Sequence, residues 1–124
     1  AVLIISCKKE YLQPRSGIFR GTFEMTETEG DGFETGDCTL ALDDKNESFS
    51  LNVDSTSEFP HKSYGSYIIL DATKMKFNSN TIALEFGNQN FVLDSIFNYT
   101  FDDIRFELTT KIGTVVYDYK FIRY

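Results

Sequence analysis

Hydrophobic and polar side chains alternate along short segments through most of the chain. In residues 18–27, Phe19, Phe23 and Met25 share one face, and the other face is mostly polar. A period of two residues is typical of a strand with one buried and one solvated face. Gly21 lies in the middle of this segment and predicts a bend or a close approach of the backbone.

The same alternation recurs as far as the C-terminus. Further strands are predicted at residues 38–42, 49–53, 64–70, 73–77, 81–86, 95–101, 104–110 and 114–123. The apolar faces of the later strands carry Phe77, Leu84, Phe86, Phe97, Tyr99, Phe101, Phe106, Leu108, Tyr117, Tyr119 and Phe121. Turn residues separate the strands at 43–46, at 78–80 and at Asp102-Asp103. No segment combines a helical period with caps, so we expect an all-β fold.

Strands of this number and spacing indicate a single antiparallel up-and-down β-barrel, with a β-sandwich as the alternative. We expect roughly eight to ten strands. With 124 residues the chain fits one domain, and its 12 Phe and 7 Tyr suit the half-buried surface of a sheet. The formal net charge is −7 and the 12 Lys and Arg are scattered singly, so nucleic acid is not an expected partner.

The first residues suggest an anchor on a membrane. An apolar run over residues 1–5 is too short to span a bilayer, which takes about 20 apolar residues. It is followed by Ser6 and Cys7, and residues 4–7 resemble a bacterial lipobox, in which the peptidase cuts just before a cysteine that is lipidated. The resemblance implies a lipid on Cys7. We therefore expect residues 1–16 to be the end of a lipoprotein signal and a tether, and residues 17–124 to be the barrel domain. The alternative is an ordinary N-terminal strand with an incidental cysteine.

The second half of the chain is similar to the small lipocalin-like lipoproteins of Bacteroidota-type bacteria. The matching pieces are Gly65-Ser66-Tyr67 and residues 74–77, 97–103 and 117–121. The resemblance implies a lipid-anchored β-barrel in the bacterial cell envelope, on the periplasmic or surface face of the outer membrane. The chain departs from the pattern at Asp103, where a glycine is common. The family has no shared catalytic residues to transfer.

The inventory of reactive residues is small. Cys38 falls on an apolar face, where a free cysteine acts as a small hydrophobe, although pairing with Cys7 is an alternative. His61 is the single histidine, so a usual zinc site would need both cysteines. Residues 27–32 have part of the spacing of a calcium loop, but the twelfth position holds Cys38 instead of a bidentate Glu. We expect no metal and no cofactor.

We expect a binding module and no enzyme. Gly65-Ser66-Tyr67 lacks the second glycine of a nucleophile elbow, and Gly30-Asp31-Gly32 lacks the lysine of a phosphate loop. One hypothesis is that the barrel binds a small apolar ligand near the loops at residues 28–36 and 54–63.

The alternative hypothesis is a protein interaction module with a filled barrel, such as an inhibitor or accessory subunit. Large Phe, Tyr and Leu side chains on the inward faces favour the filled barrel. Candidate ligand- or partner-binding residues are Phe59, His61 and Tyr64, in a loop that contains Pro60, together with Tyr67. The alternative for these aromatic residues is that they simply cover an end of the barrel.

Overall fold

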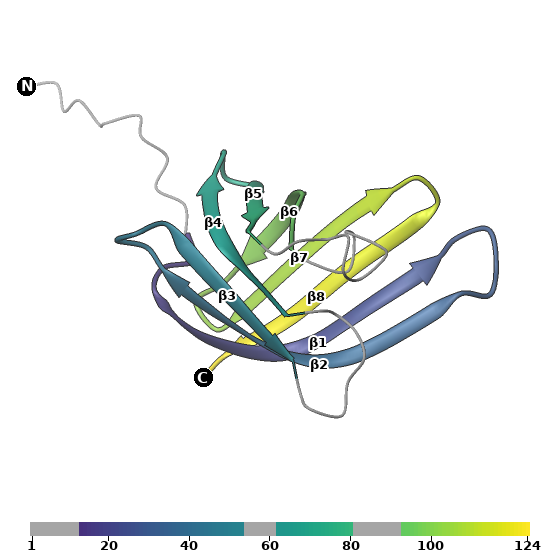
Figure 1. The fold of residues 1–124 in the computed structure, drawn as a ribbon, viewed down its shortest axis with the longest axis horizontal. Helices are drawn as coiled ribbons and strands as arrows, with labels where there is room; N and C mark the ends of the chain where they lie inside the picture. The colour runs from purple at the N-terminus through teal and green to yellow at the C-terminus, as the bar shows by residue number, and fades with distance from the viewer. Residues whose placement is uncertain (1–12, 54–61, 81–92) are drawn as a thin grey trace, which may run out of the picture.

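The chain forms a closed antiparallel β-barrel (Figure 1). The computed structural model describes residues 13–53, 62–80 and 93–124. Eight strands follow one another in chain order: β1 (Gly17–Glu27), β2 (Phe33–Asp43), β3 (Ser48–Val53), β4 (Ser63–Ile69), β5 (Lys74–Ser79), β6 (Ile96–Phe101), β7 (Arg105–Ile112) and β8 (Val115–Arg123). Each strand pairs with the next, and β1 pairs with β8, so the sheet closes on itself. The predicted all-β, up-and-down barrel is confirmed, and the sandwich alternative is wrong.

Two turns were placed incorrectly by the sequence pattern. The loop predicted at residues 28–36 is shorter, because β2 begins at Phe33 and pairs with β1 from Phe33 opposite Thr26 onward. The turn predicted at residues 78–80 is also wrong in part, because Asn78 and Ser79 continue β5 opposite β4. In both places, pairing with a neighbouring strand overrides the local preference of glycine, serine and asparagine for turns.

Other turns form where their residue types predict them. Both Oδ atoms of Asp43 accept hydrogen bonds from the β2–β3 turn, from Lys45 N (3.1 Å) and Asn46 Nδ2 (2.8 Å). Between β6 and β7, Asp102 Oδ1 accepts from Ile104 N (3.0 Å) and Arg105 N. The predicted strand at residues 81–86, with Leu84 and Phe86, lies outside the described residues.

Two glycines allow the strands to come together closely. A Cβ atom at Gly21 would overlap the carbonyl oxygen of Lys120 on β8, and one at Gly65 would overlap the carbonyl oxygen of Asn78 on β5. Glycine at such positions lets a barrel bend sharply without breaking its ladder of hydrogen bonds. The expected close backbone approach at Gly21 is therefore confirmed.

The inward faces supply one hydrophobic core. Its buried members are Phe19, Phe23, Cys38, Leu40, Leu42, Phe49, Leu51, Tyr67, Met75, Phe77, Leu93, Phe97, Tyr99, Phe106, Leu108, Tyr117, Tyr119 and Phe121. Every residue that we predicted on the apolar faces and that is described belongs to this core or, like Phe101 and Met25, packs against it. This alternation of buried and exposed positions is typical of an antiparallel strand that has one face on the core and the other in solvent.

Residues just outside the strands are buried at both ends of the barrel. At the end where β1 begins, Pro14 is fully buried, and the guanidinium of Arg123 lies 5.0 Å from the ring centroid of Phe19. Ser16 Oγ holds this entry segment by donating to Asp44 Oδ1 (2.6 Å). Leu93, just before β6, is also fully buried, and its backbone N donates to Ser63 Oγ (3.4 Å).

Candidate functional site

Aromatic rings fill the described part of the barrel interior. The ring of Phe77 lies 5.2 Å from that of Phe49 and 5.8 Å from that of Phe97, with edge-to-face geometry in both pairs. On the other side of the core, the Phe106 ring lies 5.3 Å from the Phe19 ring. These are the separations at which aromatic pairs pack in protein cores. An eight-stranded barrel is narrow enough to be filled by its own side chains, and the rings of the described residues pack against one another inside this one.

One polar group is buried in this core without a partner. The Tyr119 ring packs against those of Phe23 (5.0 Å) and Phe97 (5.8 Å), and its hydroxyl has no hydrogen-bond partner in the described structure. Burial raises the pKa of Tyr119 well above its usual value, so the hydroxyl is protonated at neutral pH. A buried hydroxyl without a partner makes the fold less stable, and this one faces packed rings.

The structure separates the predicted binding tyrosines. Tyr64 and Tyr67 both lie on β4, but Tyr64 points outward and is 58% exposed, whereas Tyr67 points inward and is 4% exposed. Residues an odd number of positions apart point to opposite faces of a strand. Tyr64 and Tyr67 are three positions apart, so their side chains cannot line one surface. Phe59, His61 and the predicted lipidation residue Cys7 lie outside the described residues, so their roles stay predictions.

Tyr67 lies beside a pocket at the end of the barrel where the chain enters. The pocket has a volume of about 330 Å3 and lies between the entry segment, with Pro14, and the β2–β3 turn, with Asp44 and Glu47. Burial, and then the charges of Asp44, Asp43 and Glu47, raise the pKa of Tyr67 to about 12. The phenol is therefore a neutral hydrogen-bonding group at the edge of an acidic turn.

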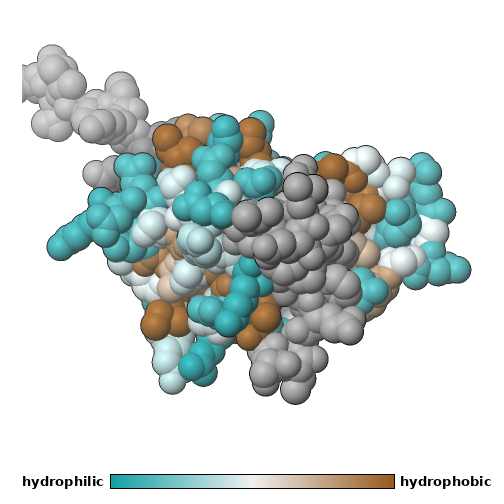
Figure 2. Space-filling model, in the orientation of Figure 1, coloured by the Kyte–Doolittle hydropathy of each residue, from teal (hydrophilic) through white to brown (hydrophobic). Residues whose placement is uncertain are grey.

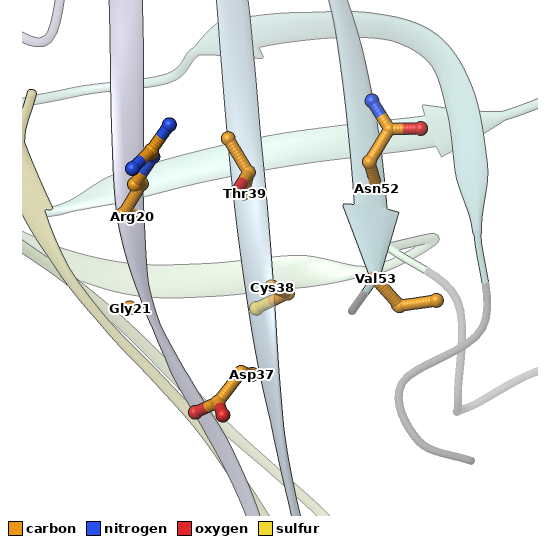
Figure 3. Close-up of a pocket in the computed structure, with 7 residues that line it drawn as sticks. All are labelled: Arg20, Gly21, Asp37, Cys38, Thr39, Asn52 and Val53. Carbon is orange, nitrogen blue, oxygen red and sulfur yellow. The ribbon is translucent and has the colours of Figure 1, made fainter. Parts of the chain in front are cut away.

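A second pocket opens on the outer face of β1, β2 and β3 (Figure 3). It has a volume of about 370 Å3, and Arg20, Thr39 and Asn52 lie on three neighbouring strands beside it. Cys38 also borders it, but burial, followed by the charge of Asp37, raises the pKa of its thiol to about 12. The thiol is thus protonated and buried in the core, as predicted, and the pocket offers polar contacts and no activated nucleophile.

A third pocket, which the sequence pattern did not predict, opens on the outer face of β1, β8 and β7. Its volume is about 390 Å3, and it is lined by Arg20, Gly21, Thr22, Arg105, Glu107, Lys120, Phe121 and Ile122. Three of these side chains are basic and one is acidic, on a chain whose net charge is −7. The alternation predicted that Arg20 and Lys120 face outward. Only the pairing of β1 and β7 with β8 brings them next to Arg105.

The acidic loop after β1 is held as a hairpin turn. Glu27 N donates to Gly32 O (2.9 Å), and the Glu27 carboxylate accepts from Glu29 N (3.2 Å). A hydrogen bond from the Thr114 side chain, in the β7–β8 turn, is the main cause that lowers the pKa of Glu27. Among the described residues, no group of three or more His, Cys, Asp or Glu side chains is placed to hold a metal ion.

Exposed apolar residues occur on the outside of the barrel. On the face seen in Figure 2 they form separate groups among polar ones. The described residues contain no helix of the length and apolar character needed to cross a membrane.

Comparisons with known proteins give no relatives. No family model matches the chain, and no curated protein or solved structure shows a significant match. The fold itself, a closed eight-stranded antiparallel barrel, is consistent with the lipocalin-like resemblance. Membership of a lipoprotein family stays a prediction.

Proposed function

We propose that this chain is a non-catalytic interaction module, a filled β-barrel that binds another protein through its outer surface or loops. The observation that carries this proposal is the packed interior, in which the Phe77 ring packs edge to face against the rings of both Phe49 and Phe97. A filled barrel acts as a rigid support for the residues that it displays. An inhibitor or an accessory subunit of an envelope complex would have this architecture.

The competing candidate is the binding of a small apolar ligand inside the barrel. Ligand pockets usually have volumes of about 300–1,000 Å3 and bury most of the ligand. The pockets described above reach that size, but they lie on the outer face and at the entry end, and polar side chains line much of each of them. The packed core therefore makes an internal apolar ligand the weaker candidate.

A non-catalytic role is part of the proposal. Cys38 is a buried thiol with a pKa of about 12, and the phenol of Tyr67 is neutral at physiological pH, so neither is an activated group. The carboxylates of Asp43, Asp71 and Asp102 have lowered pKa values because they accept hydrogen bonds within their own turns. These aspartates stabilise turns, and their lowered pKa values make them poor proton donors.

We place the module in the bacterial cell envelope, held by a lipid on Cys7. This part of the proposal is supported by the lipobox-like residues 4–7, which precede the barrel by a short connecting segment. Metabolic labelling with an alkynyl fatty acid tests it in a bacterial host that processes lipoproteins. The full chain should become labelled, and a Cys7→Ser variant should not. Equal labelling of both would contradict lipidation at this residue.

Native mass spectrometry of the chain purified from its own host, combined with photo-crosslinking, tests the interaction role. A photo-crosslinking amino acid is introduced at one position at a time, in place of Ile122, Ile68 or Tyr64, which are all exposed on the outer face. We expect native mass spectrometry to give the mass of the chain without a bound small molecule. We expect at least one crosslinking position to capture one partner protein. A small apolar molecule that leaves only on denaturation, with no protein crosslink from any position, would contradict the proposal and favour the ligand-binding alternative.

A further inference from the structure

The third pocket has a regular arrangement of charge around an apolar centre. Ile122 on β8 pairs with Arg20 on β1 and with Arg105 on β7, so these three residues form one row across three strands. All three are exposed, and Ile122 is 58% exposed. Neighbouring strands lie about 4.8 Å apart, so the two arginine backbones are about 10 Å apart with the isoleucine between them.

A third cation lies in the next row of outward-facing residues along β8. Lys120 pairs with Thr22 on β1 and with Glu107 on β7, two residues before Ile122 on the same strand. Two residues along a strand span about 6.6 Å, so the three cations form a triangle that has Ile122 on one side. Among the described residues, none of these three side chains forms a close ion pair. Arg105 is nevertheless near Asp102, whose pKa is lowered first by backbone hydrogen bonds from Arg105 and Ile104 and then by the charge of Arg105.

One of these arginines is held in position. The guanidinium of Arg20 lies 3.8 Å from the ring centroid of Tyr124, which is 77% exposed. Stacking on a ring leaves the edge of the guanidinium free to form paired hydrogen bonds with a carboxylate. Ile18, opposite Tyr124, adds another exposed apolar side chain beside it.

Charge complementarity selects the occupant. A second copy of the chain docked on itself through this face would bring cations against cations, which is unfavourable. An anionic bilayer would attract these cations but would repel a chain with a net charge of −7. A separate protein segment that carries carboxylates around an apolar residue matches both the charge and the apolar centre of the pocket.

We propose that the outer face formed by Arg20, Ile122, Arg105 and Lys120 binds an extended acidic segment of a partner protein. In an extended segment, every second residue faces the same side. Acidic residues at the first and fifth positions then lie about 13 Å apart, within reach of the two long arginine side chains, and an apolar residue at the third position meets Ile122. This inference rests on the proposed interaction function and specifies the chemistry of the partner.

Isothermal titration of the full chain with synthetic peptides tests the pairing. The probe is a capped nonapeptide with Glu-Thr-Leu-Thr-Glu at its centre, and the control peptide has Gln at both acidic positions. We expect the acidic peptide to bind, and its affinity to fall at least about tenfold between about 0.05 and 0.5 M salt, because surface charge pairs are screened. Binding of the Gln peptide with equal affinity would overturn the proposal.

Matched variants locate the contact. The double substitution R20Q/R105Q should weaken binding about tenfold, the effect expected for the loss of two surface charge pairs. The control K74Q/K76Q removes the same charge from exposed residues on β5, on the other side of the barrel, and should bind as the wild type does. Equal loss in both double variants would show attraction to net charge alone and would overturn the proposal.

Two further outcomes separate this inference from the proposed function. Anionic vesicles that bind the chain through Arg20 and Arg105, when the peptide does not, would show a lipid surface as the occupant and overturn the inference. Protein crosslinks at Tyr64 or Ile68, together with no peptide binding, would leave the interaction function standing and reject this face as its site.

Discussion

At the scale of single residues, the buried polar groups of the core decide how the barrel responds to mutation and pH. Tyr119 and Cys38 are both core members that carry a titratable group. Neither is needed for packing in its polar form, because the Tyr119 hydroxyl has no partner in the described structure and Cys38 acts as a small hydrophobe. Their polar atoms should therefore limit stability instead of adding to it.

Removal of the Tyr119 hydroxyl should stabilise the protein. Tyr119→Phe keeps the ring contacts with Phe23 and Phe97 and removes a buried donor that has no partner, so the free energy of unfolding should rise by about 1 kcal/mol. Urea denaturation measures this change in the free energy of unfolding. Tyr99→Phe is the matched control, because the Tyr99 hydroxyl donates to Asp71 O (3.1 Å) and its loss should lower stability by about 1 kcal/mol. Equal effects of the two substitutions would contradict the conclusion that the Tyr119 hydroxyl has no hydrogen-bond partner.

Alkaline pH should destabilise the barrel. Burial, and then the charge of Asp37, raise the pKa of the Cys38 thiol from 9.0 to about 12 in the folded protein. Between these values the unfolded chain binds fewer protons than the folded one, so stability falls as pH rises. Tyr67, whose pKa rises from 10.0 to about 12, acts in the same direction in the upper part of this window.

Cys38→Ala tests this linkage. Urea midpoints measured from about pH 8 to about pH 11 should fall less steeply in the variant than in the wild type, whatever their absolute values. Equal slopes of urea midpoint against pH for the two proteins would show that the Cys38 thiol does not contribute to the pH dependence of stability.

At the scale of strands, closure of the barrel depends on backbone contacts at glycine. At Gly21, β1 comes so close to β8 that any side chain would overlap the Lys120 carbonyl. The β1–β8 pairing in turn places Arg20 beside Ile122. The glycine therefore supports both the fold and the proposed binding face.

Gly21→Ala should be strongly destabilising, by about 3 kcal/mol or more, because backbone on both sides must shift. Gly113→Ala is the control. Gly113 has a left-handed φ of 64° but nothing near its Cβ position, so its substitution should cost only about 1 kcal/mol. Urea denaturation of both variants measures the difference. If Gly113→Ala were the more harmful change, strain in φ and not strand contact would dominate.

At the scale of the whole molecule, the proposed interaction role depends on the packing of aromatic rings inside the barrel. Phe77 lies where the rings of Phe49, Tyr67 and Phe97 meet. Because those rings belong to neighbouring strands, they cannot all move to fill a space left at Phe77. A cavity made there should remain open.

Phe77→Ala should convert the filled barrel into a hollow one. We expect a loss of about 3–5 kcal/mol in the free energy of unfolding. An apolar cavity of this kind binds benzene, so benzene should raise the melting temperature of the variant and leave that of the wild type unchanged. Phe77→Leu, which removes less volume, serves if the alanine variant does not fold. Stabilisation of the wild type by benzene would contradict a filled interior.

Much of the fold could be predicted from the sequence, because alternation is a local property of each strand. Phe19, Phe97 and Phe121 were placed in the core from their period alone, and the structure buries them. Turns with strong local chemistry, such as Asp102-Asp103, were also predicted. The start of β2 at Phe33 was not, because the length of a hairpin depends on how far its partner strand continues.

The candidate site was much less predictable. Tyr64 and Tyr67 are close in sequence but lie on opposite faces of β4, which the alternation already implied. Arg20, Arg105 and Lys120 come from distant parts of the chain, and nothing local in the sequence links them.

The sequence by itself determined which residues face inward, because a strand places alternate side chains on opposite faces wherever it lies. It thereby determined an all-β fold with an aromatic core. The tertiary structure alone decided which outward residues are neighbours, because the closure of β1 on β8 and the register of each ladder depend on contacts between distant segments. The basic face around Ile122 is therefore a product of the register, whereas the core is a product of the pattern.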